Sequence, residues 1–209
     1  MKKVLNIALI SFSVAASAQI SLAGKANLIF PTGSPSWRNI SNSATAAFEN
    51  KGSNSVGFNA GLSVKVDLPL GFFAMPEVYY TTFKNEFTDP VSNTTFDVKN
   101  NRLDVPLLVG HKVLGNTLGV FIGPVMSYNL AKEDTYNDFV ENAKKQFTVG
   151  YQFGAQIELK SLILNAKYEG ALTKDQRDFV RRVGGAGNTE TIRYDNRANL
   201  FMVGIGYKF

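Results

Sequence analysis

The sequence has no cysteine, only one histidine and no long apolar run beyond its first residues. Without cysteine no disulfide can form, so hydrogen bonds and packing must stabilise the fold. A helix that crosses a membrane needs about 20 consecutive apolar residues, and no stretch after the N-terminal segment approaches that length. These absences argue against transmembrane helices in the mature chain. They leave open a β-barrel, whose apolar residues alternate with polar ones and whose mean hydropathy is near neutral, here −0.06.

The N-terminus has the three parts of a signal peptide. Lys2 and Lys3 precede an apolar run from Val4 to Val14, and the small-residue pattern Ala15-Ala16-Ser17-Ala18 follows. The apolar run is too short to cross a bilayer, so a cleaved signal is favoured over a membrane anchor. We expect cleavage after Ala18, which divides the chain into a signal peptide, 1–18, and one exported domain, 19–209.

The charge pattern excludes one class of partner. The net charge of +5 falls to +3 once Lys2 and Lys3 are removed with the signal. The remaining lysines and arginines are scattered rather than clustered, so no nucleic-acid footprint is present.

Apolar and polar residues alternate with a period of two along most of the mature chain. The clearest case is 55–68, where Val56, Phe58, Ala60 and Leu62 begin an uninterrupted apolar face. A helix with 3.6 residues per turn would mix these two sets, so the pattern indicates strands. Eight such strands are predicted: 20–30, 55–68, 72–83, 102–112, 117–129, 147–159, 162–172 and 199–209. The predicted fold is therefore all-β, an eight-stranded antiparallel up-and-down transmembrane β-barrel.

Short and long connections alternate strictly between these strands. The short ones lie at 69–71, 114–116 and 160–161, and the long ones at 31–54, 84–101, 131–146 and 173–196. In an up-and-down barrel this alternation places all turns on one rim and all loops on the other. Outer-membrane barrels have periplasmic turns and extracellular loops, so four long extracellular loops are predicted.

The next question is which face of the barrel meets lipid. The polar face is rich in glycine, which suits the narrow interior of an eight-stranded barrel. Aromatic residues occur on the apolar face near the strand ends, as in the interfacial girdles of membrane barrels. Both features favour an outward apolar face. The alternative is a soluble, lipocalin-like barrel that encloses its apolar face and binds a small apolar ligand.

An inward polar face would enclose many charges. They are Lys25, Lys65, Asp67, Glu77, Arg102, Asp104, Lys112, Glu158, Lys167, Glu169 and Lys208. Unpaired buried charges cost several kcal/mol, so we expect them to pair with one another and fill the interior. A narrow selective channel is the alternative, which the small cross-section of eight strands disfavours.

No set of residues suggests catalysis, a metal or a cofactor. The single histidine, His111, lies near the turn end of its strand with lipid-facing parity, which predicts an interfacial residue rather than a general base. The glycine-rich stretch 184–188 lacks the strand and helix of a phosphate-binding loop. The acidic stretch 133–138 lacks the glycine and the terminal glutamate of a calcium loop. We therefore expect a protein that is not an enzyme.

Several strands resemble a known family. The segments 102–112 (RLDVPLLVGHK), 121–125 (FIGPV), 151–159 (YQFGAQIEL) and 165–173 (NAKYEGALT) are similar to successive strands of the outer-membrane β-barrel domain family of Bacteroidota. That family includes PorT-like barrels of the type IX secretion system and is akin to small OmpA- or OmpX-like eight-stranded barrels. The resemblance implies a location in the bacterial outer membrane. It also implies that Phe209 is an assembly signal for the barrel assembly machinery.

These observations favour an interaction or structural barrel. Its expected surroundings are outer-membrane lipid and lipopolysaccharide, and its loops could bind an unknown protein partner. The alternatives are a component of a secretion or assembly system, a narrow channel and the soluble lipocalin-like binder.

Overall fold

The structure is a computed structural model that describes the greater part of the chain. It covers residues 19–32, 36–39, 49–51, 53–88, 95–130, 135–136, 139–143, 147–173, 175–182, 189–196 and 199–209. The signal peptide predicted for 1–18 lies outside these residues. Within them, no helix is long and apolar enough to cross a membrane.

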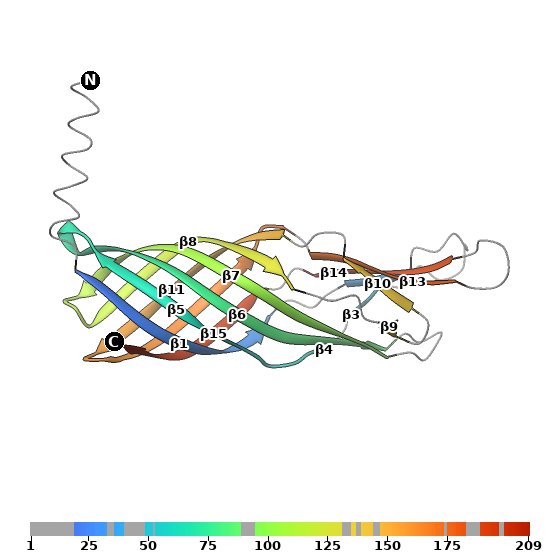
Figure 1. The fold of residues 1–209 in the computed structure, drawn as a ribbon, viewed down its shortest axis with the longest axis horizontal. Coiled ribbons are helices and arrows are strands. Elements are labelled where there is room, and N and C mark those ends of the chain that lie inside the picture. Colours follow the sequence, from blue (N-terminus) through green and yellow to red (C-terminus); the bar gives the residue numbers. More distant parts are fainter. Residues whose placement is uncertain are drawn as a thin grey trace, which may run out of the picture.

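Eight antiparallel strands close into a barrel (Figure 1). They are β1 (Ile20–Pro31), β5 (Gly57–Asp67), β6 (Phe72–Thr88), β7 (Thr95–Leu114), β8 (Leu118–Asn129), β11 (Phe147–Leu159), β12 (Leu162–Ala171) and β15 (Leu200–Lys208). Around the wall their order is β6-β5-β1-β15-β12-β11-β8-β7, and pairing of β6 with β7 closes the ring. The predicted fold class is confirmed. The physical reason is twofold. Alternating apolar and polar residues suit a strand with one face in lipid and one in the interior, and closing the ring leaves no edge strand with unpaired backbone N–H and C=O groups.

The short connections lie at one rim, where β1 begins and β15 ends (Figure 1). A 3₁₀ turn, η1 (Pro69–Gly71), joins β5 to β6, and its Leu70 has a φ of 62°. Two residues join β11 to β12, and the first of them, Lys160, has a φ of 58°. Left-handed backbone conformations of this kind are what tight hairpins require.

A second sheet lies beyond the opposite rim, which corrects the prediction of four long loops (Figure 1). Its strands are β2 (Ser36–Asn39), β3 (Glu49–Lys51), β9 (Thr135–Tyr136), β10 (Phe139–Ala143), β13 (Asp175–Arg182) and β14 (Thr189–Asn196), in the order β3-β2-β14-β13-β10-β9. β6 and β7 also run past the rim as a hairpin that pairs up to Thr88 and Thr95, and the short β4 (Ser53–Asn54) pairs with β6. The segments predicted as loops therefore contain strands, because their backbone N–H and C=O groups pair with one another outside the barrel.

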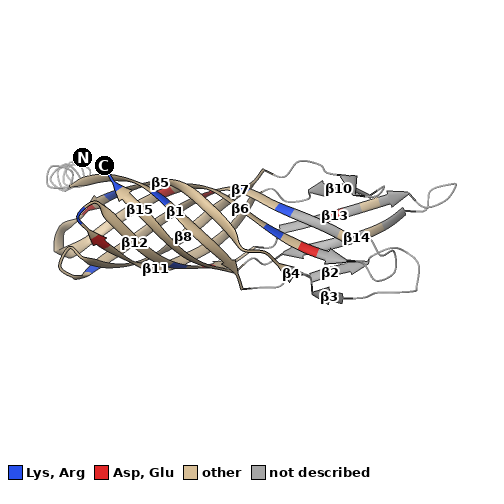
Figure 2. Ribbon diagram, turned by 90° about the horizontal axis from the view of Figure 1, so that it is seen from below, with Lys and Arg blue, Asp and Glu red and all other residues tan. Residues whose placement is uncertain are grey.

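The two faces of the barrel wall are chemically opposite. Large apolar side chains are exposed on the outside, among them Leu28, Phe58, Val78, Tyr80, Leu107, Val109, Ile122, Phe153, Leu164 and Ile205. Polar and charged side chains are buried inside, among them Lys25, Asn59, Ser63, Glu77, Thr81, Asp104, Gln156, Lys167 and Glu169. Charged residues are accordingly sparse along the barrel and reappear on β6 and β7 where these strands leave it (Figure 2). A polar interior and an apolar exterior exclude the soluble, lipocalin-like alternative.

Candidate functional site

The barrel interior contains three layers of ion pairs. The middle layer joins Lys25 of β1, Glu77 of β6 and Lys167 of β12. Each lysine Nζ binds one carboxylate oxygen of Glu77, at 2.7 Å for Lys25 and 2.6 Å for Lys167. All three side chains are at most 1% exposed. Lys167 also donates to the hydroxyl of Tyr79 at 3.1 Å, so the neighbouring inward residue of β6 takes part in the same network.

The middle layer crosses the full width of the barrel. β6 and β12 are separated by four steps in either direction around the ring, so they lie on opposite walls. The contact between Glu77 and Lys167 therefore lies across the centre of the lumen.

A second layer lies toward the rim that carries the second sheet. Arg102 of β7 contacts Asp104 at 3.0 Å and Glu169 of β12 at 2.5 Å. The hydroxyl of Thr81 donates to Asp104 at 2.6 Å, and the amide of Gln152 donates to Glu169 at 3.5 Å. Charged and neutral donors thus share these two buried carboxylates, although Oδ1 of Asp104 has no hydrogen-bond donor among the described residues.

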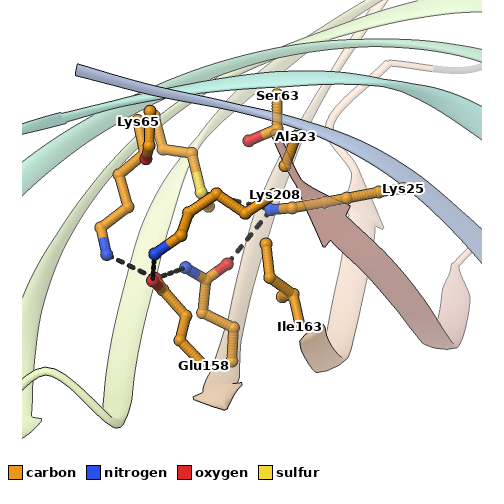
Figure 3. A pocket seen from close by; sticks show the side chains of 10 residues that line it. Ala23, Lys25, Ser63, Lys65, Glu158, Ile163 and Lys208 are labelled. Carbon is orange, nitrogen blue, oxygen red and sulfur yellow. Dashed lines mark hydrogen bonds and ion pairs between the residues drawn. The ribbon is translucent and has the colours of Figure 1, made fainter. Parts of the chain in front are cut away.

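The third layer closes the short-turn rim (Figure 3). Lys65 of β5 reaches across to Glu158 of β11 on the opposite wall, and Lys208 approaches the same carboxylate at 3.7 Å. Asp67 forms an ion pair with Lys112 at 2.8 Å and a longer one with Lys65 at 3.7 Å. Lys65, Glu158 and Lys208 border a cavity of about 10 Å³, which is about the room that one water molecule needs.

The structure thus places all eleven inward charges identified in the sequence within these layers. They are Lys25, Lys65, Asp67, Glu77, Arg102, Asp104, Lys112, Glu158, Lys167, Glu169 and Lys208. Each has at least one partner of opposite sign, and the six positive and five negative charges almost cancel. Chemically, this arrangement is a network of buried ion pairs that spans the barrel interior.

Several neutral residues of the interior were not singled out by the sequence. Tyr79, Thr81, Gln152 and Gln156 all donate to or accept from the charges described above. Strand parity could have identified them, since they lie on the same inward face as the predicted charges. What parity could not reveal is which residue on a distant strand each one contacts.

Apolar residues fill the remaining interior at two levels. Phe73, Met75, Leu108 and Phe121 form one buried cluster, and Ile29, Phe83, Leu200 and Met202 form another. The rings of Phe73 and Phe83 also lie 5.1 Å from Lys65 Nζ and 5.6 Å from the Arg102 guanidinium carbon. Such cation–π contacts add to the packing of the interior.

His111 lies outside this network. It is exposed on the outer wall at the short-turn rim, with its ring edge-on to Phe72 at a centroid distance of 4.8 Å. The two rings border a shallow groove of about 380 Å³ that is otherwise lined by apolar side chains such as Val120 and Ile122. In the described part of the chain no group of three histidine, aspartate or glutamate side chains is placed to hold a metal ion.

Phe209 completes the seam between the last strand and the first. Its backbone N–H donates to the carbonyl of Leu22 at 2.9 Å, and its ring lies over Gly24. The side chain is nevertheless 75% exposed, on the outer wall at the short-turn rim. Of the other segments considered in the sequence, 184–188 and most of 133–138 lie outside the described residues.

Comparisons with known proteins agree with this architecture. The family model "Outer membrane protein beta-barrel domain" matches residues 18–174. The fold is similar to that of the outer membrane protein OprG from Pseudomonas aeruginosa, with a TM-score of 0.65, 12% identity and coverage of 91% of this chain and 95% of OprG. It is also similar to the outer membrane protein AlkL in lipid bilayers, with a TM-score of 0.54, 13% identity and coverage of 91% and 90%. No curated protein matches the sequence.

Proposed function

The chain belongs to the outer membrane protein β-barrel domain family and is a protein of the outer membrane, and from this premise we propose that it is an anchored interaction module. In this proposal the barrel is a closed anchor, and the second sheet is the part that meets a partner outside the cell. The observation that carries the proposal is that sheet, built from six strands beyond one rim while ion pairs fill the lumen beneath it.

The orientation follows from the asymmetry of the two rims. One rim carries only short turns, and the other carries the second sheet and the β6–β7 hairpin. Outer-membrane barrels keep short turns in the periplasm and their longer connections outside. The second sheet would then face the medium, where a protein partner or lipopolysaccharide can reach it. The exposed Phe209 would face the barrel assembly machinery from the periplasmic side during insertion.

The filled interior argues against a channel as the main activity. Two ion pairs, Lys167 with Glu77 and Lys65 with Glu158, connect opposite walls at different levels. Planar-bilayer recordings of the refolded protein should therefore show no stepwise conductance. Reproducible single-channel steps would contradict the closed-anchor part of the proposal.

Surface labelling of intact cells tests the orientation. One variant carries an epitope between β6 and β7, at 89–94, and the matched control carries the same epitope in the β7–β8 turn at 115–117. Antibody should bind intact cells that express the first variant, and should bind the second only after the envelope is permeabilised. The reverse pattern would overturn the proposed orientation.

A second experiment tests whether the second sheet binds a partner. Cross-linking on intact cells is compared between the full-length protein and a variant in which a short Gly-Asn-Gly linker replaces 174–197. Cross-linked products that disappear in the shortened variant would support an interaction role for the β13–β14 hairpin. Identical products from both proteins would place the contact elsewhere and argue against that role.

A further inference from the structure

A small cavity lies inside the barrel at the short-turn end of the lumen (Figure 3). Its volume is about 10 Å³, the room that one water molecule needs. Polar side chains from four strands line it, namely Lys25 of β1, Ser63 and Lys65 of β5, Gln156 and Glu158 of β11, and Lys208 of β15. Cavities of this size with several polar groups on their walls hold water, whereas apolar cavities stay empty.

The contact between Lys208 and Glu158 is too long for a direct hydrogen bond. Lys208 Nζ lies 3.7 Å from Oε2 of Glu158, whereas N–H···O bonds in proteins are about 2.7–3.2 Å long. Lys65 and Gln156 donate to the other oxygen of this carboxylate, Oε1. Both residues of the long contact border the cavity. A water molecule there can accept from Lys208 and donate to Oε2, which replaces one long contact by two hydrogen bonds.

Ser63 provides a third partner for the same water molecule. It lines the cavity from β5 and is only 2% exposed, and a serine hydroxyl both donates and accepts. Lys25 also borders the cavity, but its ammonium group already donates to Glu77, Gln156 and Met75. Buried water molecules make about three hydrogen bonds each. The ammonium of Lys208, the carboxylate of Glu158 and the hydroxyl of Ser63 supply that number at one cavity.

We propose that this cavity is a binding site for one ordered water molecule. The water accepts a hydrogen bond from Lys208 Nζ and donates to Oε2 of Glu158 and Oγ of Ser63. It thereby joins β15, β11 and β5 and completes the third layer of ion pairs. A neutral ligand suits the site better than a halide, because a halide is larger than water and Glu158 would repel it. The site belongs to the barrel interior, so it does not depend on which rim faces the medium.

The test measures magnetisation transfer from water by NMR, using the isotope-labelled mature protein in detergent micelles. Ala23 and Ala26 lie on the same strand with opposite parity. Ala23 lines the cavity and is 5% exposed, whereas Ala26 is exposed on the outer wall, where detergent covers it. Transfer from water should reach the Ala23 methyl group and the β-protons of Ser63. The Ala26 methyl group should receive none.

The variant Ala23→Val tests the assignment to the cavity. Its two additional methyl groups fill the space of the water molecule, so the transfer to Ser63 should be lost. The hydroxyl of Ser63 remains in this variant, and a signal relayed only by exchange of the hydroxyl proton would therefore persist. Ala26→Val is the matched control, because it makes the same change on the outer face of β1, and it should leave the transfer unchanged.

A second pair of variants removes a hydrogen-bonding partner without adding volume. Ser63→Ala should weaken the transfer to the Ala23 methyl group, since the water loses one of three partners. Ser127→Ala is its control, because Ser127 is an equally buried inward serine on β8 that does not line the cavity. The gel shift between boiled and unboiled samples verifies that each variant is folded.

Three results would overturn the proposal. One is the absence of transfer to both Ala23 and Ser63 in the wild type. Another is transfer to Ser63 that is unchanged in folded Ala23→Val. The third is a saturable shift of the Ser63 resonances when sodium bromide is added, with sodium sulfate as the ionic-strength control, because it would assign the cavity to a halide.

Discussion

Glu77 and Lys167 meet across the full width of the barrel, with 2.6 Å between the carboxylate Oε2 and the ammonium Nζ. They belong to β6 and β12, which lie four strands apart in both directions around the ring. Both side chains are at most 1% exposed, and Lys25 binds the second oxygen of the same carboxylate. One glutamate therefore pairs with two buried lysines and ties three strands together.

The first prediction concerns this shared carboxylate. Glu77→Gln would leave Lys25 and Lys167 without a negative partner in the middle layer, and breaking a buried pair in this way costs about 3–5 kcal/mol. We expect the free energy of unfolding to fall by that amount when urea unfolding is measured in lipid vesicles. The control Glu86→Gln changes an exposed glutamate on the same strand and should shift stability by no more than about 0.5 kcal/mol. Similar midpoints for both variants would contradict the assigned role of Glu77.

The second prediction concerns coupling across the third layer, at the short-turn rim. Glu158→Met would leave Lys65 with only its longer contact to Asp67, whereas Lys65→Met/Glu158→Met removes both charges of the wall-to-wall pair. Replacing a whole buried pair by apolar groups is often nearly neutral, so the double variant should be more stable than the single one. A double-mutant cycle should give a coupling free energy of about 1–3 kcal/mol. Additive effects would show that the two side chains do not interact in the membrane.

The third prediction concerns a close approach inside the wall. A Cβ at Gly204 would overlap Asn27 Oδ1 and lie 2.5 Å from the carbonyl oxygen of Ala26, whereas a Cβ at Gly24 would lie 3.6 Å from the ring of Phe209. Gly204→Ala should therefore destabilise the barrel by about 1–3 kcal/mol through strain. Gly24→Ala, on the neighbouring strand, should be tolerated. Unfolding of both variants in vesicles measures the difference, and equal stability would contradict the close packing of β15 against β1 at Gly204.

The fourth prediction concerns the turn between β11 and β12. Lys160 has a φ of 58°, which a residue with a Cβ adopts at a cost and glycine adopts freely. Lys160→Gly should raise the free energy of unfolding by about 0.5–1 kcal/mol. Ser161→Gly is the control in the same turn, since Ser161 has no such φ, and it should give no gain. A loss of stability in Lys160→Gly would show that the turn has another conformation.

The fifth prediction concerns independence of the barrel from the second sheet. The barrel ring is complete without β13 and β14, which among the described strands pair with each other and with β10 and β2. Replacing 174–197 by a short Gly-Asn-Gly linker should therefore leave the folded barrel intact. The gel mobility of unboiled samples should still differ from that of boiled samples. Loss of that difference would show that the second sheet is needed for the barrel to fold.

The strand ranges show how far sequence reasoning reached and where it failed. The strand predicted at 147–159 agrees with β11 at both ends, because alternation there is uninterrupted and a two-residue turn ends it. The strand predicted at 72–83 continues in the structure to Thr88, as β6. Beyond the membrane there is no lipid to require an apolar outer face, so the alternation that marks the barrel strands disappears. The second sheet was missed for this reason.

The sequence by itself determined the strand parity, the closed up-and-down order and the apolar exterior. These follow from local rules, since a period of two sorts side chains between two faces and short turns join neighbouring strands. Only the tertiary structure decided that Glu77 meets Lys167, that Lys65 reaches Glu158, and that the loop segments assemble into a second sheet. Those pairings depend on the shear and diameter of the closed barrel, which bring together residues about 90 positions apart in the chain.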